Sequence, residues 1–180
     1  MSRTIHLCLA ALGILATLPS TAWSQASMGS SSGRWFYGGG IGLGFGDVTY
    51  FSIQPMVGYR VSDRLSVGGS LIYRYRSDNR YASDLTTSDY GASAFGRYTI
   101  AGPFFAQAEL EQLSYEYVRS NLTTTRTDAT SLFAGGGISQ PIGNNVNAFA
   151  TVMYNLSYGS QSPSPYSSPW VIRIGVGVGF

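Results

Sequence analysis

The last eleven residues, WVIRIGVGVGF at positions 170–180, decide the fold. Large apolar side chains stand at every second position there, namely Trp170, Ile172, Ile174, Val176, Val178 and Phe180. The positions between them carry Val171, Arg173 and three glycines. Because successive side chains of a β-strand point to opposite faces, this pattern predicts a strand with one apolar face and one mostly small or charged face.

The same alternation recurs along the chain, which shows no helical period of 3.6 after Trp35. The other alternating segments are Trp35–Asp47, Phe51–Val61, Leu65–Arg76, Tyr90–Ile100, Phe104–Glu111, Leu132–Ile142 and Val146–Tyr158. Together with the last segment they predict eight strands. After Leu110 the phase slips, so that Leu113, Tyr115 and Tyr117 form the apolar set. Either a bulge near Glu111–Gln112 or a strand leaving the membrane there would explain the slip.

The two faces of these segments differ in side-chain size as well as polarity. The apolar face carries the bulky and aromatic residues, whereas the other carries mainly glycine, serine and arginine. The interior of an eight-stranded barrel is just wide enough for side chains to fill, so we expect the bulky face outside, in hydrocarbon. Since an open sheet edge in lipid leaves backbone groups unpaired, the sheet is expected to close. The sequence thus predicts an all-β, eight-stranded antiparallel up-and-down transmembrane β-barrel.

Connections between the segments alternate in length, as in outer-membrane barrels. Tight turns are predicted at Ser62–Arg64, Ala101–Pro103 and Gly143–Asn145, and longer loops at Ser77–Asp89, Arg119–Asp128 and Gly159–Pro169. Only the first hairpin, around Gly46–Thr49, breaks the pattern by being short. Tyrosine, phenylalanine and tryptophan gather near both ends of the segments, as the aromatic girdles of a membrane barrel do.

The N-terminal region reads as an export signal followed by a linker. Leu7–Leu18 is an apolar stretch of signal-peptide length, and Ser24-Gln25-Ala26 fits a cleavage site. We therefore predict a cleaved signal peptide over residues 1–26, a Gly/Ser-rich linker over 27–33 and the barrel domain over 34–180. The alternative is a retained anchor helix, although spanning takes about 20 residues. The single cysteine and single histidine, Cys8 and His6, both lie within the predicted signal.

The eight amphipathic segments and the ending at Phe180 make the chain resemble the small bacterial outer-membrane β-barrels. Similar families are the transmembrane domain of outer-membrane protein A and the outer-membrane protein X group. The resemblance implies a place in the outer membrane, among outer-membrane lipid and lipopolysaccharide. It also implies that the barrel-assembly machinery reads an assembly signal at Ile174, Val176, Val178 and Phe180.

Charged residues fall on the predicted lumen face, which makes them the candidate site. They are Arg60, Arg74, Arg76, Arg97, Glu109, Glu111 and Arg173. Paired within a narrow lumen they would form an electrostatic plug. The alternative interpretation is a gate or ion path, with a weak preference for anions because arginines outnumber glutamates.

Other candidate sites are weaker. The Gly40–Gly46 run has a period of two and no following helix, which indicates small lumen-facing residues rather than a nucleotide loop. Asp78, Asp84 and Asp89 lack a compact Ca²⁺-loop pattern, so a solvated loop is expected and no metal or other cofactor is predicted. Arg80, Arg119 and Arg126 could contact lipopolysaccharide phosphates or simply be solvated. A net charge of +2 without a basic run gives no indication of nucleic-acid binding.

Three classes of function remain. The first is a non-enzymatic barrel with a structural or surface-interaction role, which would contact an extracellular ligand through its outer loops. The second is a narrow pore or carrier for small solutes. The third is a lipid-modifying enzyme, which the lack of histidine outside the predicted signal disfavours, since a serine nucleophile needs a base. The first class is the prediction.

Overall fold

The structure is a computed structural model that describes residues 34–44, 48–78, 85–118, 124–160 and 164–179. The predicted signal peptide and linker, residues 1–33, lie outside the described residues, as does Phe180. In the described part of the chain, no helix is long and apolar enough to span a membrane.

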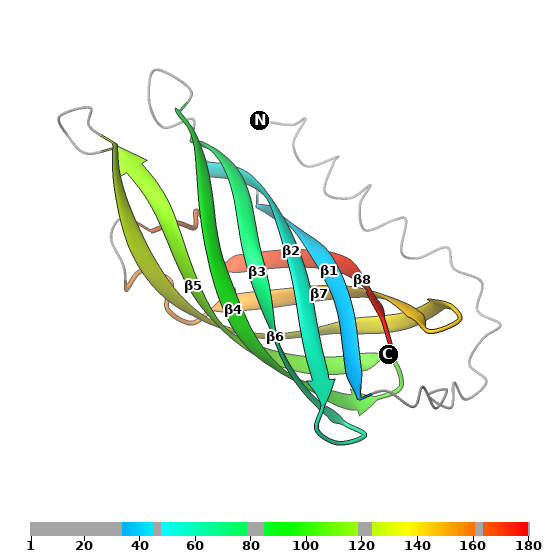
Figure 1. Ribbon diagram of the computed structural model, residues 1–180. Coiled ribbons are helices and arrows are strands. Elements are labelled where there is room, and N and C mark those ends of the chain that lie inside the picture. The colour runs from blue at the N-terminus through cyan, green and yellow to red at the C-terminus, as the bar shows by residue number, and fades with distance from the viewer. Residues whose placement is uncertain (1–33, 45–47, 79–84, 119–123, 161–163, 180) are drawn as a thin grey trace, which may run out of the picture.

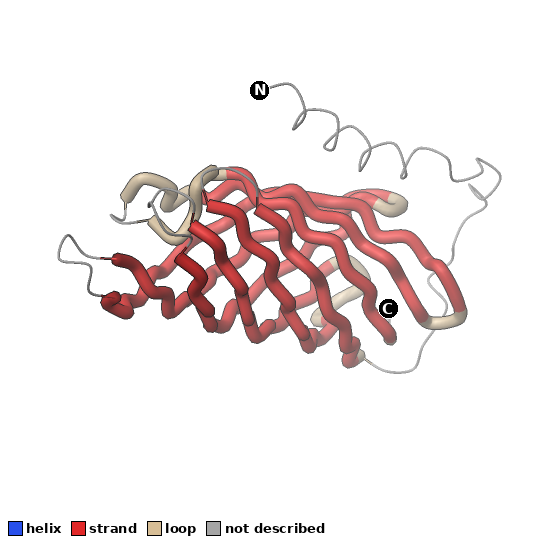
Figure 2. Tube along the Cα trace, turned by 90° about the horizontal axis from the view of Figure 1, so that it is seen from above, coloured by secondary structure: helices blue, strands red, loops and turns tan. Residues whose placement is uncertain are grey.

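Eight antiparallel strands form one closed barrel in which each strand pairs with its neighbours in sequence and β1 pairs with β8 (Figures 1 and 2). The strands are β1 Trp35–Gly44, β2 Val48–Arg60, β3 Leu65–Asp78, β4 Leu85–Ala101, β5 Phe104–Val118, β6 Thr124–Gly143, β7 Val146–Asn155 and β8 Trp170–Val178. Closure brings Ile41 of β1 opposite Ile174 of β8. The predicted fold class is therefore confirmed, with all eight strands in their predicted places.

Strands β4, β5 and β6 are longer than predicted, with 17, 15 and 20 residues. Crossing a bilayer takes about 9–11 residues of tilted strand, so these strands are longer than a span requires, and they project past the other strands at the end opposite the tight turns (Figure 1). About half of each of the predicted loops Ser77–Asp89 and Arg119–Asp128 is consequently strand. The residues outside the described structure there are 79–84 and 119–123.

Of the two explanations offered for the phase slip after Leu110, the bulge near Glu111–Gln112 is ruled out. β5 pairs with β6 from Phe104 to Val118 without a register shift. Leu113 and Tyr115 stay in phase with Glu111 and point inward, at 1% and 2% exposure. The apparent slip arises because the end of β5 lies outside the apolar belt. There the outward side chains are polar, and the inward side chains Leu113 and Tyr115 are apolar.

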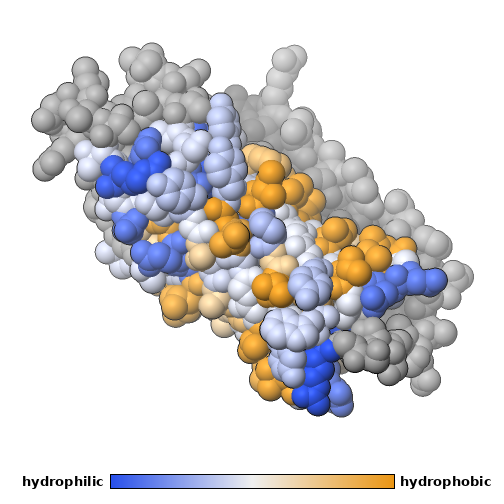
Figure 3. Space-filling model, in the orientation of Figure 1, coloured by the Kyte–Doolittle hydropathy of each residue, from blue (hydrophilic) through white to orange (hydrophobic). Residues whose placement is uncertain are grey.

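Apolar side chains cover the outside of the barrel (Figure 3). Leu71, Ile172 and Val176 are 66%, 52% and 50% exposed, while Arg74 and Arg173 are 1% and 6% exposed. Exposing apolar area to water would cost about 25 cal/mol per Å², so this surface suits hydrocarbon. The orientation of the two faces is as predicted.

Inside the barrel, four phenylalanines each lie directly opposite a glycine of the neighbouring strand. The pairs are Phe36–Gly58, Phe95–Gly68, Phe105–Gly137 and Phe149–Gly175. A Cβ at Gly58 would come within 2.1 Å of the Phe36 ring, and one at Gly175 within 2.5 Å of the Phe149 ring. The glycines thus make room for the rings. The expectation of a lumen lined by small and charged residues alone is therefore incomplete.

The three predicted tight turns are present at one end of the barrel, where β1 begins and β8 ends (Figure 1). Two of them use a positive φ, 53° at Gly102 and 65° at Asn145. Glycine has no Cβ to clash in this conformation, and asparagine is among the few other residues that adopt it readily.

Candidate functional site

The charged residues of the lumen come from four strands and share the inward phase of each. Arg74 and Arg76 lie on β3, Asp89 and Arg97 on β4, Glu109 and Glu111 on β5, and Arg173 on β8. All seven are buried, with Glu111 and Asp89 at 0% exposure. Buried charges are normally paired, because desolvating an unpaired ion is costly.

Two glutamates and two arginines form a central cluster across the barrel. Arg173 Nη1 lies 2.5 Å from Glu109 Oε2, and Arg173 Nη2 lies 3.2 Å from Glu111 Oε2. Arg74 Nη2 lies 3.7 Å from Glu111 Oε1. The cluster therefore ties β3, β5 and β8 together through the lumen.

Tyr166, from the connection between β7 and β8, reaches down onto this cluster. Its hydroxyl accepts a hydrogen bond from Arg74 Nη2 at 2.7 Å and donates one to Glu111 Oε1. Its ring packs edge-on against Tyr50 and Phe133, with centroids 6.1 and 5.4 Å away. Burial, with a further contribution from the nearby Glu111 carboxylate, raises the pKa of the Tyr166 hydroxyl well above its usual range. The neutral phenol is thereby kept as a donor to the Glu111 carboxylate.

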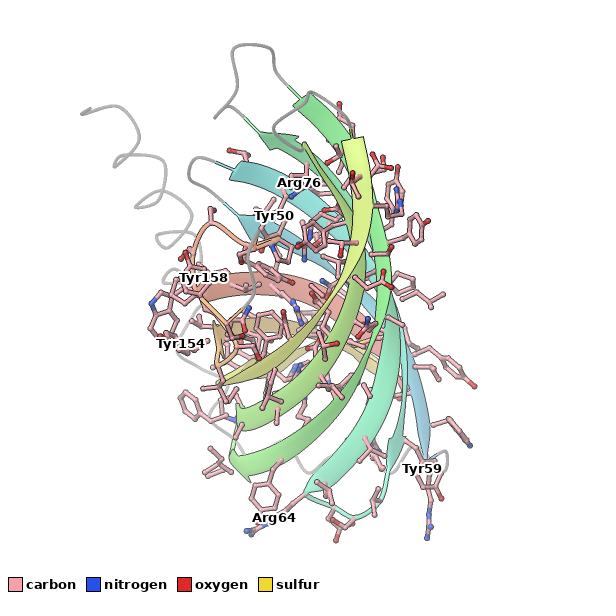
Figure 4. The ribbon with its side chains drawn as sticks, turned by 90° about the vertical axis from the view of Figure 1, so that its left-hand side faces the viewer. Tyr50, Tyr59, Arg64, Arg76, Tyr154 and Tyr158 are labelled. Carbon is pink, nitrogen blue, oxygen red and sulfur yellow. The ribbon has the colours of Figure 1, made fainter. Side chains whose placement is uncertain are left out.

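Arg76 and Asp89 form a second pair nearer the loop end of the barrel, where Figure 4 shows Arg76 beside Tyr50. Arg76 Nε lies 3.5 Å from Asp89 Oδ2. Pairing between β4 and β5 stops at Tyr90 opposite Ser114. Beyond that point, Asp89 accepts the Glu116 backbone N–H at 3.4 Å, and Arg76 donates to the Glu116 carbonyl. Side chains here hold together two strands whose backbone pairing has ended.

Arg97 lies nearer the tight turns and has a neutral partner. Its Nε and Nη2 both donate to Gln107 Oε1, at 3.0 and 2.8 Å. Gln107 Nε2 in turn donates to Glu109 Oε2 at 3.1 Å, which links Arg97 indirectly to the central cluster.

Arg60 stands apart from the other predicted site residues. It is half-buried, and its Nη2 donates to the Gly179 carbonyl at 2.7 Å. The structure therefore brings six of the seven predicted residues into the lumen network and places Arg60 at its rim.

Besides Gln107, the predicted site lacked Asp89 and Tyr166, which also belong to the network. Asp89, expected in a solvated loop with Asp78 and Asp84, is in β4 and pairs with Arg76. Asp89 lies two residues before Gly91, in phase with Ser93 and Phe95, and this spacing could have indicated that its side chain points into the lumen. Tyr166 gave no such signal, because a loop residue that folds back has no strand phase.

The predicted assembly residues Ile174, Val176 and Val178 point outward from β8, at 42%, 50% and 49% exposure. Outward aromatic residues lie toward both ends of the barrel, as Tyr154 and Tyr158 near one end and Tyr59 near the other illustrate (Figure 4). Phe180 and Phe45, which were predicted for the assembly signal and a girdle, lie outside the described residues.

The architecture is that of the small bacterial outer-membrane β-barrels. The N-terminal β-barrel domain of Pseudomonas aeruginosa OprF has a similar structure, with a TM-score of 0.55 at 16% identity over 82% of this chain and 98% of that one. Neisserial surface protein A (NspA) is also similar, with a TM-score of 0.50 at 18% identity over 81% and 96%. No family model and no curated protein sequence matches the chain. At these identities the likeness concerns the fold.

Proposed function

We propose that this protein is a non-enzymatic barrel of the bacterial outer membrane with a structural or surface-interaction role. The observation that carries the proposal is the filled lumen. Phenylalanine–glycine pairs pack its turn end, the arginine–glutamate cluster crosses its middle, and Tyr166 covers that cluster from the loop side. A barrel so packed favours a plug over an ion path.

Planar-bilayer recording tests this proposal. The purified, refolded protein should produce no steady single-channel steps under an applied voltage. Steady, unitary currents would overturn the proposal and favour the narrow pore, in which case the arginine excess predicts a preference for anions. The solvent-exposed variant Arg64→Gln serves as the control, since it leaves the lumen unchanged.

The surface role is proposed for the strand ends that continue beyond the membrane, together with the three longer connections. On the outer face of this extension, Arg126 pairs with Glu116 at 2.6 Å and lies over the Tyr90 ring, 4.3 Å from its centroid. A guanidinium beside an aromatic girdle is suited to lipopolysaccharide phosphates. Arg80 and Arg119, proposed for the same role, lie outside the described residues.

Cross-linking from the end of β4 and from the connection between β7 and β8, in intact cells, tests the surface role. Single cysteines at Ser88 and Ser164 carry the cross-linker, and Ser62→Cys at a tight turn serves as the control. Specific products from the first two sites, absent from the third, would support an extracellular partner. Equal products from all three would contradict it.

A further inference from the structure

Arg97 is the buried arginine of the lumen that lacks an acidic partner. It is 6% exposed, and no carboxylate oxygen of the described residues lies within 4 Å of its guanidinium. Two of its nitrogens share one oxygen of the neutral Gln107 side chain. Its Nη1 is buried and has no hydrogen-bond partner among the described residues.

The charge balance of the lumen also points to Arg97 as the arginine without a close acidic partner. The buried ionised side chains in the described structure are Arg74, Arg76, Arg97, Arg173, Asp89, Glu109 and Glu111. Four guanidiniums thus face three carboxylates, and the carboxylates all lie within 4 Å of the other three arginines. One positive charge is left over, and Arg97 is the arginine that no carboxylate oxygen of the described residues approaches within 4 Å, since Glu109 acts on it only from farther away. A buried charge without a counter-charge is strongly unfavourable.

The surroundings of Arg97 restrict what could neutralise it. Its guanidinium carbon lies 4.1 Å from the centre of the Phe105 ring, 5.0 Å from Phe149 and 5.9 Å from Phe95. Aromatic faces attract a cation but do not cancel its charge. These rings, each seated over a glycine, leave little room. So crowded a site does not suit a large anion such as a phosphate ester, which leaves a single-atom anion as the candidate.

We propose that Arg97 holds one small monovalent anion, such as chloride, at its Nη1 within the lumen. The anion supplies the missing negative charge and accepts the hydrogen bond that this nitrogen does not give to the protein. The site lies in the phenylalanine layer, between the tight turns and the central ion cluster. It is separate from any surface interaction of the loops.

Unfolding in lipid vesicles at constant ionic strength tests the site, with chloride exchanged for the much larger anion gluconate. For one site occupied only in the folded state, a tenfold rise in chloride well above half-saturation should raise the folding equilibrium constant about tenfold. Arg97→Met should abolish this dependence. Arg64→Met, at an exposed turn, should retain it. An unfolding midpoint that is the same in chloride and gluconate would overturn the proposal.

Bromide provides a second test that needs no variant. Crystals of the unaltered protein grown in sodium bromide should show an anomalous peak within hydrogen-bond distance of Arg97 Nη1. Peaks only at surface arginines would indicate adventitious ions and contradict the lumen site. A water-sized peak without anomalous signal at Arg97 would contradict it equally.

Discussion

At the scale of single residues, Glu111 is the point on which the central ion cluster converges. It is fully buried and contacts Arg74, Arg173 and Tyr166. Glu111→Ala leaves two guanidiniums without this counter-charge, so we expect it to lower the free energy of unfolding by about 3–5 kcal/mol. The urea midpoint in lipid vesicles measures the change.

A matched control lies on the outer face of the barrel. Glu116 pairs with Arg126 at 2.6 Å, and both side chains are about one-third exposed, at 31% and 32%. Solvent screens such a pair, so Glu116→Ala should lower the free energy of unfolding by less than about 1 kcal/mol. Equal losses from the two variants would show that the lumen cluster does not stabilise the barrel.

Tyr166 gives the barrel a dependence on alkaline pH. Burial raises the pKa of its hydroxyl above the usual value of 10.0, so the folded state keeps this proton after the unfolded chain has lost it. The stabilisation is therefore complete below about pH 10 and declines as pH rises through the pKa of the folded state, by up to about 1.4 kcal/mol per pH unit. The urea midpoint of Tyr166→Phe should fall less steeply between pH 9 and 11.

Tyr158→Phe is the control variant for Tyr166→Phe. Tyr158 lies in the same connection, is 41% exposed, and donates to the Ser167 carbonyl at 3.0 Å. Tyr158→Phe removes a hydroxyl from the same connection without touching the central ion cluster, so it controls for the substitution itself. If Tyr158→Phe and Tyr166→Phe change the dependence of the urea midpoint on pH equally, this dependence does not originate in Tyr166.

At the scale of strands, the phenylalanine–glycine pairs set how closely neighbours pack inside the barrel. Gly58→Ala on β2 places a methyl group against the Phe36 ring of β1, where the distance would be 2.1 Å. Overpacking of this kind costs about 1–3 kcal/mol. We expect the urea midpoint of Gly58→Ala to fall accordingly.

Gly96 of β4 lies on the outer face, and a Cβ added there would have no other atom within 4 Å. Gly96→Ala should therefore be neutral, or stabilising by about 0.5 kcal/mol, because alanine loses less backbone entropy than glycine. A loss equal to that of Gly58→Ala would argue that the two glycines share a general strand requirement rather than a packing role.

Strand number, order and orientation could be predicted because the two-residue alternation reports them directly. In segments such as Trp170–Val178 one face is apolar and the other, apart from Val171, carries small or charged residues. The ends of β4, β5 and β6 could not be predicted from the same rule, since the outer face becomes polar there, and in β5 the apolar side chains Leu113 and Tyr115 lie on the inner face instead. The same reversal made a bulge near Glu111–Gln112 one of two possible explanations of the phase slip.

The candidate site was predictable to the extent that it lies on strands. Arg74, Glu109, Glu111 and Arg173 follow from their phase, but which arginine pairs with which glutamate depends on the barrel's closure. Tyr166 depends on how a loop folds back into the lumen, which no local pattern records. The neutral partner of Arg97 likewise emerged only from the geometry.

At the scale of the whole molecule, the polarity of the inner and outer surfaces is the reverse of that in a soluble barrel. The outside is apolar and the inside holds the ion pairs. Since lipid provides no hydrogen bonds, closure between β1 and β8 is what makes this arrangement stable in a membrane. Every other proposal about the protein depends on that orientation.

Quenching of tryptophan fluorescence tests this orientation most directly. A chain lacking residues 1–26 retains Trp35 and Trp170, which point outward at 57% and 59% exposure. In vesicles of lipids brominated on their acyl chains, the fluorescence of both tryptophans should be strongly quenched. Acrylamide in the aqueous phase should quench it only weakly. Single Trp→Phe variants assign the quenching to each tryptophan. Strong quenching by acrylamide with none from the brominated lipids would contradict the account.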